Sequence, residues 1–304
     1  MDAASAPGQE VDVPELPEVE VVRAGLEPAI TGATVAGVRV FDERSLRRHD
    51  APAEDFVDRM IGSTFEAPRR RGKFLWVPTG SDAALVVHLG MSGQVLLRNP
   101  DAPRDRLTRI SVDVMHPVLG ALRVDFVDQR IFGSMAIDTL VESGDVAGDL
   151  VPSQVAHIAR DPMDANFNDA RFFTRLAKRN TGIKRALLDQ TLISGIGNIY
   201  ADEALWASRI HYDQPTSGLS RPRAKTLLAE VRLVLRRALA EGGTSFDAQY
   251  LNVNGESGYF SHSLNAYGQQ GEPCPRCGRP IVREQFMNRG SHFCPFCQRI
   301  RLGR

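Results

Sequence analysis

The four cysteines of this 304-residue chain all lie near its C-terminus, in two Cys-X-X-Cys pairs. The pairs are Cys274 with Cys277 and Cys294 with Cys297. Two thiolate pairs at this spacing are typical of a single tetrahedral Zn²⁺, and four thiolates close its coordination sphere. The pattern therefore predicts one structural, non-catalytic zinc; the alternative is four cysteines without a metal. In the zinc interpretation, residues 286–293 form a hairpin with Arg289 at its tip.

Positive charge is concentrated in parts of the chain, although the whole is balanced. Lys and Arg number 37, Asp and Glu number 37, and the isoelectric point is near 7.1, which by itself argues mildly against nucleic acid binding. Residues 1–68 carry an excess of acids, whereas bases dominate 69–73, 171–188 and 274–304. A single basic run is usually a solvated face. Three runs beside an acidic segment indicate a polarised molecule with one side that faces phosphate.

A glycine-rich turn leads into a helix at residues 192–205, with the sequence LISGIGNIYADEAL. Asn198 lies in the capping region of that helix. The first amides of a helix have no internal partner and favour an anion, so the turn predicts a phosphate site. The alternative is a turn that only satisfies backbone geometry.

Two large apolar residues, Met91 and Phe132, lie beside glycine turns in HLGMSG and DQRIFG. Such residues either belong to a core or project as exposed wedges, and taken alone each favours the core. Arg130 lies two residues before Phe132. This alternation places both side chains on one face if the segment is extended.

The elements that must position these residues fall into two groups, and the first is rich in strands. Residues 17–30 have apolar residues at helical spacing and a proline in the first turn, which predicts one long helix. Short apolar or alternating runs follow, separated by Gly, Pro and Asp. This pattern predicts an N-terminal β-sandwich domain over 14–141. The stretch 142–153, which sustains neither period, is predicted to be a hinge.

The second group is helical, and we assign it to residues 154–243. Its longest pattern is an apolar stripe at helical spacing in 221–243, which predicts a buried face. Residues 244–268 have no period and are predicted to be a long loop, a kind that is usually functional. With a zinc finger at 269–304, the expected fold class is α+β.

The composition is that of an ordinary folded protein, with 42% hydrophobic and 24% charged residues. No signal-peptide pattern opens the chain, and no run of about eighteen apolar residues is free of charge, so we expect no membrane span. Confinement of the cysteines to one cluster disfavours disulfides. These features indicate a cytoplasmic protein.

Several of these motifs together resemble one protein family. The segments PELPEVE (14–20), HLGMSG, DQRIFG, GIGNIYADEAL, GGTSF and NVNGESGYF and the four-cysteine hairpin are similar, in this order, to the bacterial formamidopyrimidine-DNA glycosylases. These enzymes remove oxidised purines such as 8-oxoguanine. The resemblance implies an N-terminal β-sandwich and a helix-two-turn-helix domain with a zinc finger. It also implies damaged duplex DNA in the cleft between them, bound by a monomer associated with the nucleoid.

The resemblance also assigns roles in catalysis. Pro14 matches the N-terminal proline whose secondary amine attacks C1′ of the sugar, expels the base and leaves a Schiff base. Glu15 matches the general acid that protonates the opening sugar ring. Lys73 and Arg289 match the residues that assist β-elimination and δ-elimination. Arg289 also matches a phosphate contact.

The remaining matches are contacts with DNA. Met91, Arg130 and Phe132 match the residues that fill the space left by a flipped-out base and hold the orphaned cytosine. Lys178 and Asn198 match phosphate contacts. The loop 244–268 matches the lesion-recognition loop over the extruded base.

The chain departs from the family pattern in two places. Leu107 occupies a position where many members have a DNA-contacting histidine. Residues 1–13 precede Pro14, so its nitrogen is a tertiary amide in the chain as written and has no nucleophilic lone pair. We therefore expect residues 1–13 to be a mis-assigned or non-native extension. Initiation at a GTG codon for Val13 followed by removal of the initiator would free Pro14, and proteolytic trimming would have the same result.

Two other functions are compatible with the residues. One is an endonuclease VIII-type enzyme, which prefers oxidised pyrimidines, but the PELPEVE motif and the complete set of Met91, Arg130 and Phe132 favour the purine branch. The other is a zinc protein that binds damaged DNA without chemistry because Pro14 is blocked. Borohydride trapping on an abasic duplex separates these functions, since only an amine catalyst is captured covalently.

Overall fold

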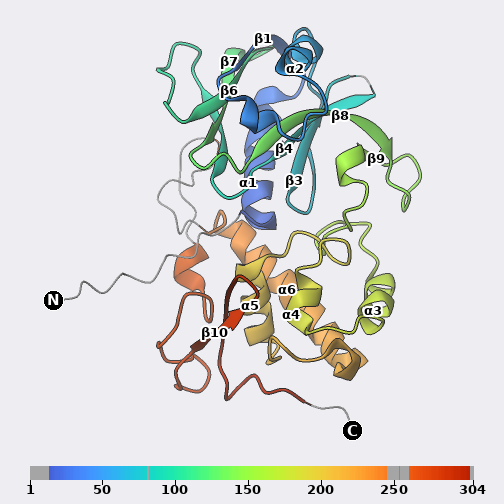
Figure 1. The fold of residues 1–304 in the computed structure, drawn as a ribbon, viewed down its shortest axis with the longest axis vertical. Coiled ribbons are helices and arrows are strands. Elements are labelled where there is room, and N and C mark those ends of the chain that lie inside the picture. The colour runs from blue at the N-terminus through green and yellow to red at the C-terminus, as the bar shows by residue number, and fades with distance from the viewer. Residues whose placement is uncertain (1–13, 81, 245–252, 254–259, 302–304) are drawn as a thin grey trace, which may run out of the picture.

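The computed structural model describes residues 14–80, 82–244, 253 and 260–301, which form a strand-rich part and a helical part (Figure 1). The strand-rich part contains β1 (Thr34–Val40), β2 (Arg69–Arg71), β3 (Phe74–Pro78), β4 (Ala83–His88), β5 (Gly93–Arg98), β6 (Thr108–His116), β7 (Gly120–Asp128), β8 (Ser134–Glu142) and β9 (Leu150–Pro152). These strands make two antiparallel sheets, with orders β1-β6-β7-β5 and β2-β3-β4-β8-β9. One apolar cluster takes side chains from both sheets, which confirms the predicted β-sandwich.

The predicted long helix is α1 (Leu16–Ile30), and it packs against the sandwich. Its apolar stripe is buried, as the helical spacing predicts, at Val19, Val22, Leu26 and Ile30. A capping box closes its first turn. The Glu15 side chain accepts from the backbone of Glu18, and the Glu18 side chain accepts from the backbone of Glu15.

A second helix in the strand-rich part, α2 (Ala53–Met60), was absent from the sequence-based prediction. It buries Phe56 and Met60, which lie one turn apart. The helix is only two turns long, so its apolar pattern is too short to stand out from the strands around it.

The segment 142–153 is more ordered than predicted. Instead of a hinge without regular structure, it contains β9, whose Val151 is buried and pairs with Val141 of β8. Tertiary pairing at the edge of the sheet overrides the weak local preference of this Gly- and Asp-rich stretch. The connection to the helical part lies later, between a 3₁₀ turn at Ser153–Val155 and residue 168.

The helical part contains α3 (Asp169–Ala177), α4 (Ile183–Leu187), α5 (Asn198–Ala207) and α6 (Arg221–Ala240). Further 3₁₀ turns lie at Glu43–Leu46, Thr216–Gly218 and Phe260–Ser263. The predicted stripe of α6 is buried against α5, which confirms it as core. Leu16, the first residue of α1, belongs to this second core, so α1 contacts both parts. Within the described ranges, no helix is both long and apolar enough to cross a membrane.

The C-terminal hairpin consists of β10 (Val282–Phe286) and β11 (Arg289–Phe293), paired antiparallel so that Phe286 faces Arg289. The buried side chain of Lys184 in α4 contacts this hairpin from the interior of the helical part. The Lys184 Nζ lies 2.7 Å from a carboxylate oxygen of Asp202 and donates to the backbone oxygen of Gly290 at 3.2 Å. Lys184 is fully buried, so its assignment to a phosphate-facing basic run is wrong.

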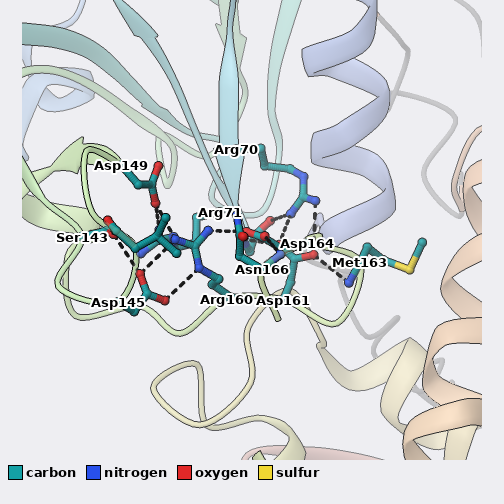
Figure 2. Close-up of polar contacts among 12 residues, drawn as sticks. Arg70, Arg71, Ser143, Asp145, Asp149, Arg160, Asp161, Met163, Asp164 and Asn166 are labelled. Carbon is teal, nitrogen blue, oxygen red and sulfur yellow. Dashed lines mark hydrogen bonds and ion pairs between the residues drawn. The ribbon is translucent and has the colours of Figure 1, made fainter. Parts of the chain in front are cut away.

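The basic run at 69–73 is also largely internal. Figure 2 shows Arg70 directed at Asp161 of the connecting segment and Arg71 directed at Asp149, which directly precedes β9. Arg70 pairs with Asp161 at 2.9 Å, and Arg71 pairs with Asp149 at 2.9 Å. Arg70 thus holds the strand-rich part to the connection, Arg71 holds the start of β9, and neither belongs to a phosphate-facing surface as the charge pattern predicts.

Candidate active site

A cavity of about 1000 Å³ lies between the two parts of the molecule. Glu15, Lys73 and Met91 line it from the strand-rich part, and Asn198 and Arg289 line it from the helical part. Residues from both ends of the chain therefore meet around one space. These five were all selected from the sequence for chemistry or DNA contact.

The Glu15 carboxyl group is buried at the start of α5. Its oxygens accept hydrogen bonds from the backbone amides of Gly197 and of Ile199, the latter at 2.9 Å. The anion at these two amides is thus a carboxylate of the protein, and the prediction that they bind a phosphate is wrong. Burial raises the pKa of Glu15 to about 7, although Lys73 and the two amides act in the opposite direction. A carboxyl group with this pKa can donate a proton near neutrality.

Lys73 is next to this carboxyl group. A Cβ atom built on Gly197 would lie 2.4 Å from Cδ of Glu15 and 2.7 Å from Nζ of Lys73. The acid and the amine therefore meet at a point where only glycine leaves room. Burial lowers the pKa of Lys73, and Glu15 partly offsets this effect. The amine consequently has a larger neutral fraction at a given pH than an ordinary lysine.

Glu18 is a site residue that the sequence analysis did not select. One oxygen of its buried carboxylate accepts from Tyr200 Oη at 2.6 Å, from Thr244 N at 2.8 Å and from Thr244 Oγ1 at 2.9 Å. The other oxygen accepts from Glu15 N at 2.9 Å. Glu18 thereby connects the start of α1 to α5 and to Thr244, which follows the end of α6. The signal was present in the sequence, since Glu18 follows Glu15 at capping-box spacing.

Pro14 directly precedes Glu15 and is buried. The hydrogen bond from Glu15 N to Glu18 holds the peptide group that follows it. Pro14 is not among the described residues that line the cavity, whereas Glu15 directly after it is.

Phe132 and Arg130 lie on an exposed turn after β7. The Phe132 side chain is 46% exposed, so it is not a core residue. Ile131 between them has a φ of 57°, and the turn closes around the buried carboxylate of Asp128, which accepts from Arg130 N at 3.2 Å and Gly133 N at 2.7 Å. The segment is therefore not extended, so the condition under which alternation would place Arg130 and Phe132 on one face is not met. Met91 is half-buried and lines the cavity.

The predicted phosphate contacts are distributed around the cavity. Lys178 is exposed at the C-terminal cap of α3, outside the cavity lining, whereas its neighbour Arg179 lines the cavity. Asn198 is the first residue of α5, and its Oδ1 is buried without a hydrogen-bond partner in the described part of the chain. Arg289 opens β11 beside the exposed turn at Met287 and Asn288.

The four cysteines fit one zinc ion. Their sulfur atoms all lie within 4.8 Å of one another, and Cys277 Sγ is 3.5 Å from Cys294 Sγ. A tetrahedron with Zn–S bonds of about 2.3 Å has S···S edges of about 3.8 Å, so a single ion suits this set. Trp206 Nε1 donates to Cys274 Sγ at 3.4 Å, the kind of contact that orients a ligand. The structure supports the predicted structural zinc site.

The chain is thus a β-sandwich joined to a helical domain with a four-cysteine hairpin, with a buried acid and an amine of shifted pKa between them. Family profiles match this arrangement part by part and define its class, a two-domain DNA glycosylase with a helix-two-turn-helix core. "Formamidopyrimidine-DNA glycosylase N-terminal domain" matches residues 13–135, "Formamidopyrimidine-DNA glycosylase H2TH domain" matches 158–249, and "Zinc finger found in FPG and IleRS" matches 271–300. The chain belongs to the formamidopyrimidine-DNA glycosylase family. It is thus a bifunctional glycosylase and AP lyase of base-excision repair.

Curated relatives and solved structures extend along nearly the whole chain. The formamidopyrimidine-DNA glycosylase of Leifsonia xyli subsp. xyli is 64% identical over 95% of this chain and 100% of its own length. That of Streptomyces avermitilis is 54% identical over 94% of this chain and 98% of its own. Lactococcus lactis Fpg in complex with DNA that contains an abasic site superposes with a TM-score of 0.79, at 30% identity, over 94% of this chain and 99% of that one.

Proposed function

We propose that this glycosylase removes oxidised purines, 8-oxoguanine and formamidopyrimidines, from duplex DNA, with Pro14 as the nucleophile. The observation that carries the proposal is the Glu15 carboxyl group, buried with a pKa near 7 on the cavity that also holds Lys73 and Arg289. This arrangement offers a proton donor to a sugar ring at the cavity wall. The names of the relatives and the DNA in the Lactococcus lactis complexes support the substrate class.

The proposed reaction begins with attack of the Pro14 nitrogen on C1′ of the damaged nucleotide. The bond from C1′ to the base breaks, the base leaves with a proton, and Glu15 protonates the ring oxygen as the sugar opens to an iminium ion. Lys73, with its lowered pKa, assists removal of a C2′ proton, which expels the 3′ phosphate in β-elimination. Arg289 assists the second elimination, which expels the 5′ phosphate.

In the proposed reaction, exposed residues allow the enzyme to reach a base that is stacked inside the duplex. Phe132 and Arg130 on the Asp128 turn, with Met91 at the cavity, occupy the space of the flipped-out nucleotide and hold the orphaned cytosine. Lys178 and Asn198 contact phosphates beside it. We infer that the enzyme acts as a monomer on chromosomal DNA.

Borohydride trapping on an abasic duplex tests the nucleophile. Protein expressed from Met1, with residues 1–13 confirmed by intact mass, should form no adduct because the Pro14 nitrogen is a tertiary amide. Protein that begins at Pro14 should form the adduct and cleave the strand. Trapping by the extended protein would refute Pro14 and assign the amine role to Lys73.

Excision from a panel of duplexes tests the substrate. Single-turnover excision with the Pro14-initiated protein should be fastest for 8-oxoguanine and formamidopyrimidine opposite cytosine. Preferential excision of an oxidised pyrimidine would support the endonuclease VIII-type alternative. Binding of all these duplexes without adduct or excision would support the non-enzymatic one.

A further inference from the structure

A second cavity, of about 410 Å³, lies where the connecting segment meets α3. It is lined by residues of 143–145 and 156–160, by the outer face of α3, and by Thr191 and Leu192. Residues 188–190, directly before these two, line the active-site cavity. A single loop therefore separates the two cavities.

One wall of this second cavity consists of charged side chains that are paired with one another. Figure 2 shows Arg160 surrounded by aspartates. It pairs with Asp145 at 2.8 Å, with Asp149 at 2.5 Å and with Asp164 at 2.8 Å. Arg71 adds a second cation to Asp149 at 2.9 Å. The carboxylates of this wall are thus already paired and do not repel an incoming anion strongly.

The α3 side of this cavity carries cations that have no ion-pair partner among the described residues. Arg171 is exposed and Arg175 is half-buried, and neither forms an ion pair with any residue in the described ranges. Asp169, the acid nearest to them in sequence, and Asp189, whose carboxylate Arg175 also stabilises, each pair with another arginine. Asp189 pairs with Arg179 at 2.6 Å, and Asp169 pairs with Arg232 at 2.6 Å.

The spacing of these cations suits a linear polyanion. Arg171, Arg175 and Lys178 are separated by four and three residues, so they follow one face of α3 and its C-terminal cap. At about 1.5 Å per residue they span roughly 10 Å. This length corresponds to about three base pairs at about 3.4 Å each. The exposed imidazole of His157 lies on the same cavity.

We propose that Arg171 and Arg175, at the rim of the second cavity, bind backbone phosphates of the duplex on one flank of the lesion. The inference rests on the proposed function, and it extends the DNA contact beyond the residues given by the family resemblance. Guanidinium groups donate two parallel hydrogen bonds to a phosphate. The paired wall formed by Arg160 and its aspartates gives this contact a fixed support.

The salt dependence of binding tests the contact. The double variant Arg171→Gln/Arg175→Gln should bind a long lesion duplex about tenfold more weakly at moderate salt. Its slope of log K against log salt should be smaller by about 2, since each lost phosphate contact contributes about 0.9. The control Arg236→Gln/Arg237→Gln removes the same charge from the exposed face of α6 and should leave the slope unchanged. An unchanged slope in the α3 variant, or an equal change in the control, overturns the proposal.

Truncated duplexes locate the contact. Two further duplexes end about four base pairs from the lesion, one on each side. On the duplex that lacks the contacted flank, wild type and α3 variant should bind equally, whereas on the other the defect should persist. The same defect on both duplexes would indicate general electrostatics and overturn the proposal. Failure of the proposed function is distinguishable, because the Pro14-initiated wild type would then form no borohydride adduct, whatever the outcome with the α3 variant.

Discussion

Glu15 experiences two opposing influences, and their balance decides its chemistry. The amides of Gly197 and Ile199 at the start of α5 stabilise the carboxylate, as does the amine of Lys73. Loss of water outweighs them, and the pKa rises to about 7. The same amides hold the carboxyl group in place. A helix N-terminus here orients a proton donor instead of binding a phosphate from solution.

The raised pKa predicts how base excision depends on pH. The general acid must be protonated and the attacking amine of Pro14 must be neutral, so the excision rate should fall above about pH 7 as Glu15 ionises and should also fall toward low pH as the amine is protonated. In Glu15→Gln the limb that falls toward high pH should vanish and the rate should drop by about 10² to 10⁴. Single-turnover excision of 8-oxoguanine across pH 5.5 to 9 measures both effects. Persistence of the limb in Glu15→Gln would assign it to another group.

The close approach of Glu15 and Lys73 to Gly197 predicts that a larger residue at this position impairs catalysis. In Gly197→Ala the new methyl group would lie 2.4 Å from Cδ of Glu15 and 2.7 Å from Nζ of Lys73, so both must move. A displacement of about 1 Å at reacting groups can cost about 10² in rate. We expect a loss of this size in excision, with little change in DNA affinity.

The matched control is Gly37→Ala on β1, where the nearest atom to the new methyl group is 3.5 Å away. It should retain full activity. Comparable activity of the two variants would show that the acid and the amine tolerate displacement.

At the scale of elements, the Asp128 turn between β7 and β8 explains how an aromatic side chain remains exposed. The Asp128 carboxylate is fully buried and accepts backbone hydrogen bonds from both ends of the turn. Arg47 donates from outside to the backbone oxygens of Ile131 and Phe132. Phe132 therefore projects from a rigid base, which a wedge that unstacks DNA requires.

Replacement of Phe132 tests the wedge. Phe132→Ala should lower excision from duplex DNA and change the melting temperature little, because the side chain is 46% exposed. Phe126→Ala is the matched control, since Phe126 is fully buried in the sandwich and its truncation should cost about 3 to 5 kcal/mol. Thermal unfolding and excision per folded molecule are measured for both. A large stability loss in Phe132→Ala with normal turnover would establish a core role.

At the level of the whole molecule, contacts from α1 and β2 are among those that bring the two parts together. Leu16 at the start of α1 packs into the helical core, Glu18 bonds to Tyr200 and Thr244, and Arg70 pairs with Asp161 of the connecting segment. The zinc hairpin adds Arg289 from the far end of the chain. The active site thus depends on the assembly of both parts.

Removal of zinc tests this dependence. The β-sandwich contains none of the four cysteines, so chelation or Cys294→Ser should leave its unfolding transition in place. The hairpin should lose its fixed base, and DNA affinity and δ-elimination should fall with it. Metal analysis measures the loss of zinc, thermal unfolding follows the sandwich transition, and binding to a lesion duplex measures the loss of DNA affinity. Absence of zinc in the purified protein, or unchanged affinity in Cys294→Ser, would contradict the prediction.

Local periodicity and residue spacing encode a large part of the fold and of the site. The stripes of α1 and α6, the alternating strands and the two cysteine pairs were predicted correctly, because each depends on which residues repeat within one element. The family motifs also selected Glu15, Lys73 and Arg289, and the structure places them on one cavity.

The charges that are available and the backbone groups that are occupied depend, in contrast, on tertiary contacts. Arg70, Arg71 and Lys184 read as free cations in the sequence, but carboxylates distant along the chain neutralise them. The α5 amides read as a phosphate site, but Glu15 occupies two of them from more than 180 positions away. Such pairings depend on contacts that only folding creates, and a one-dimensional pattern carries no information about them.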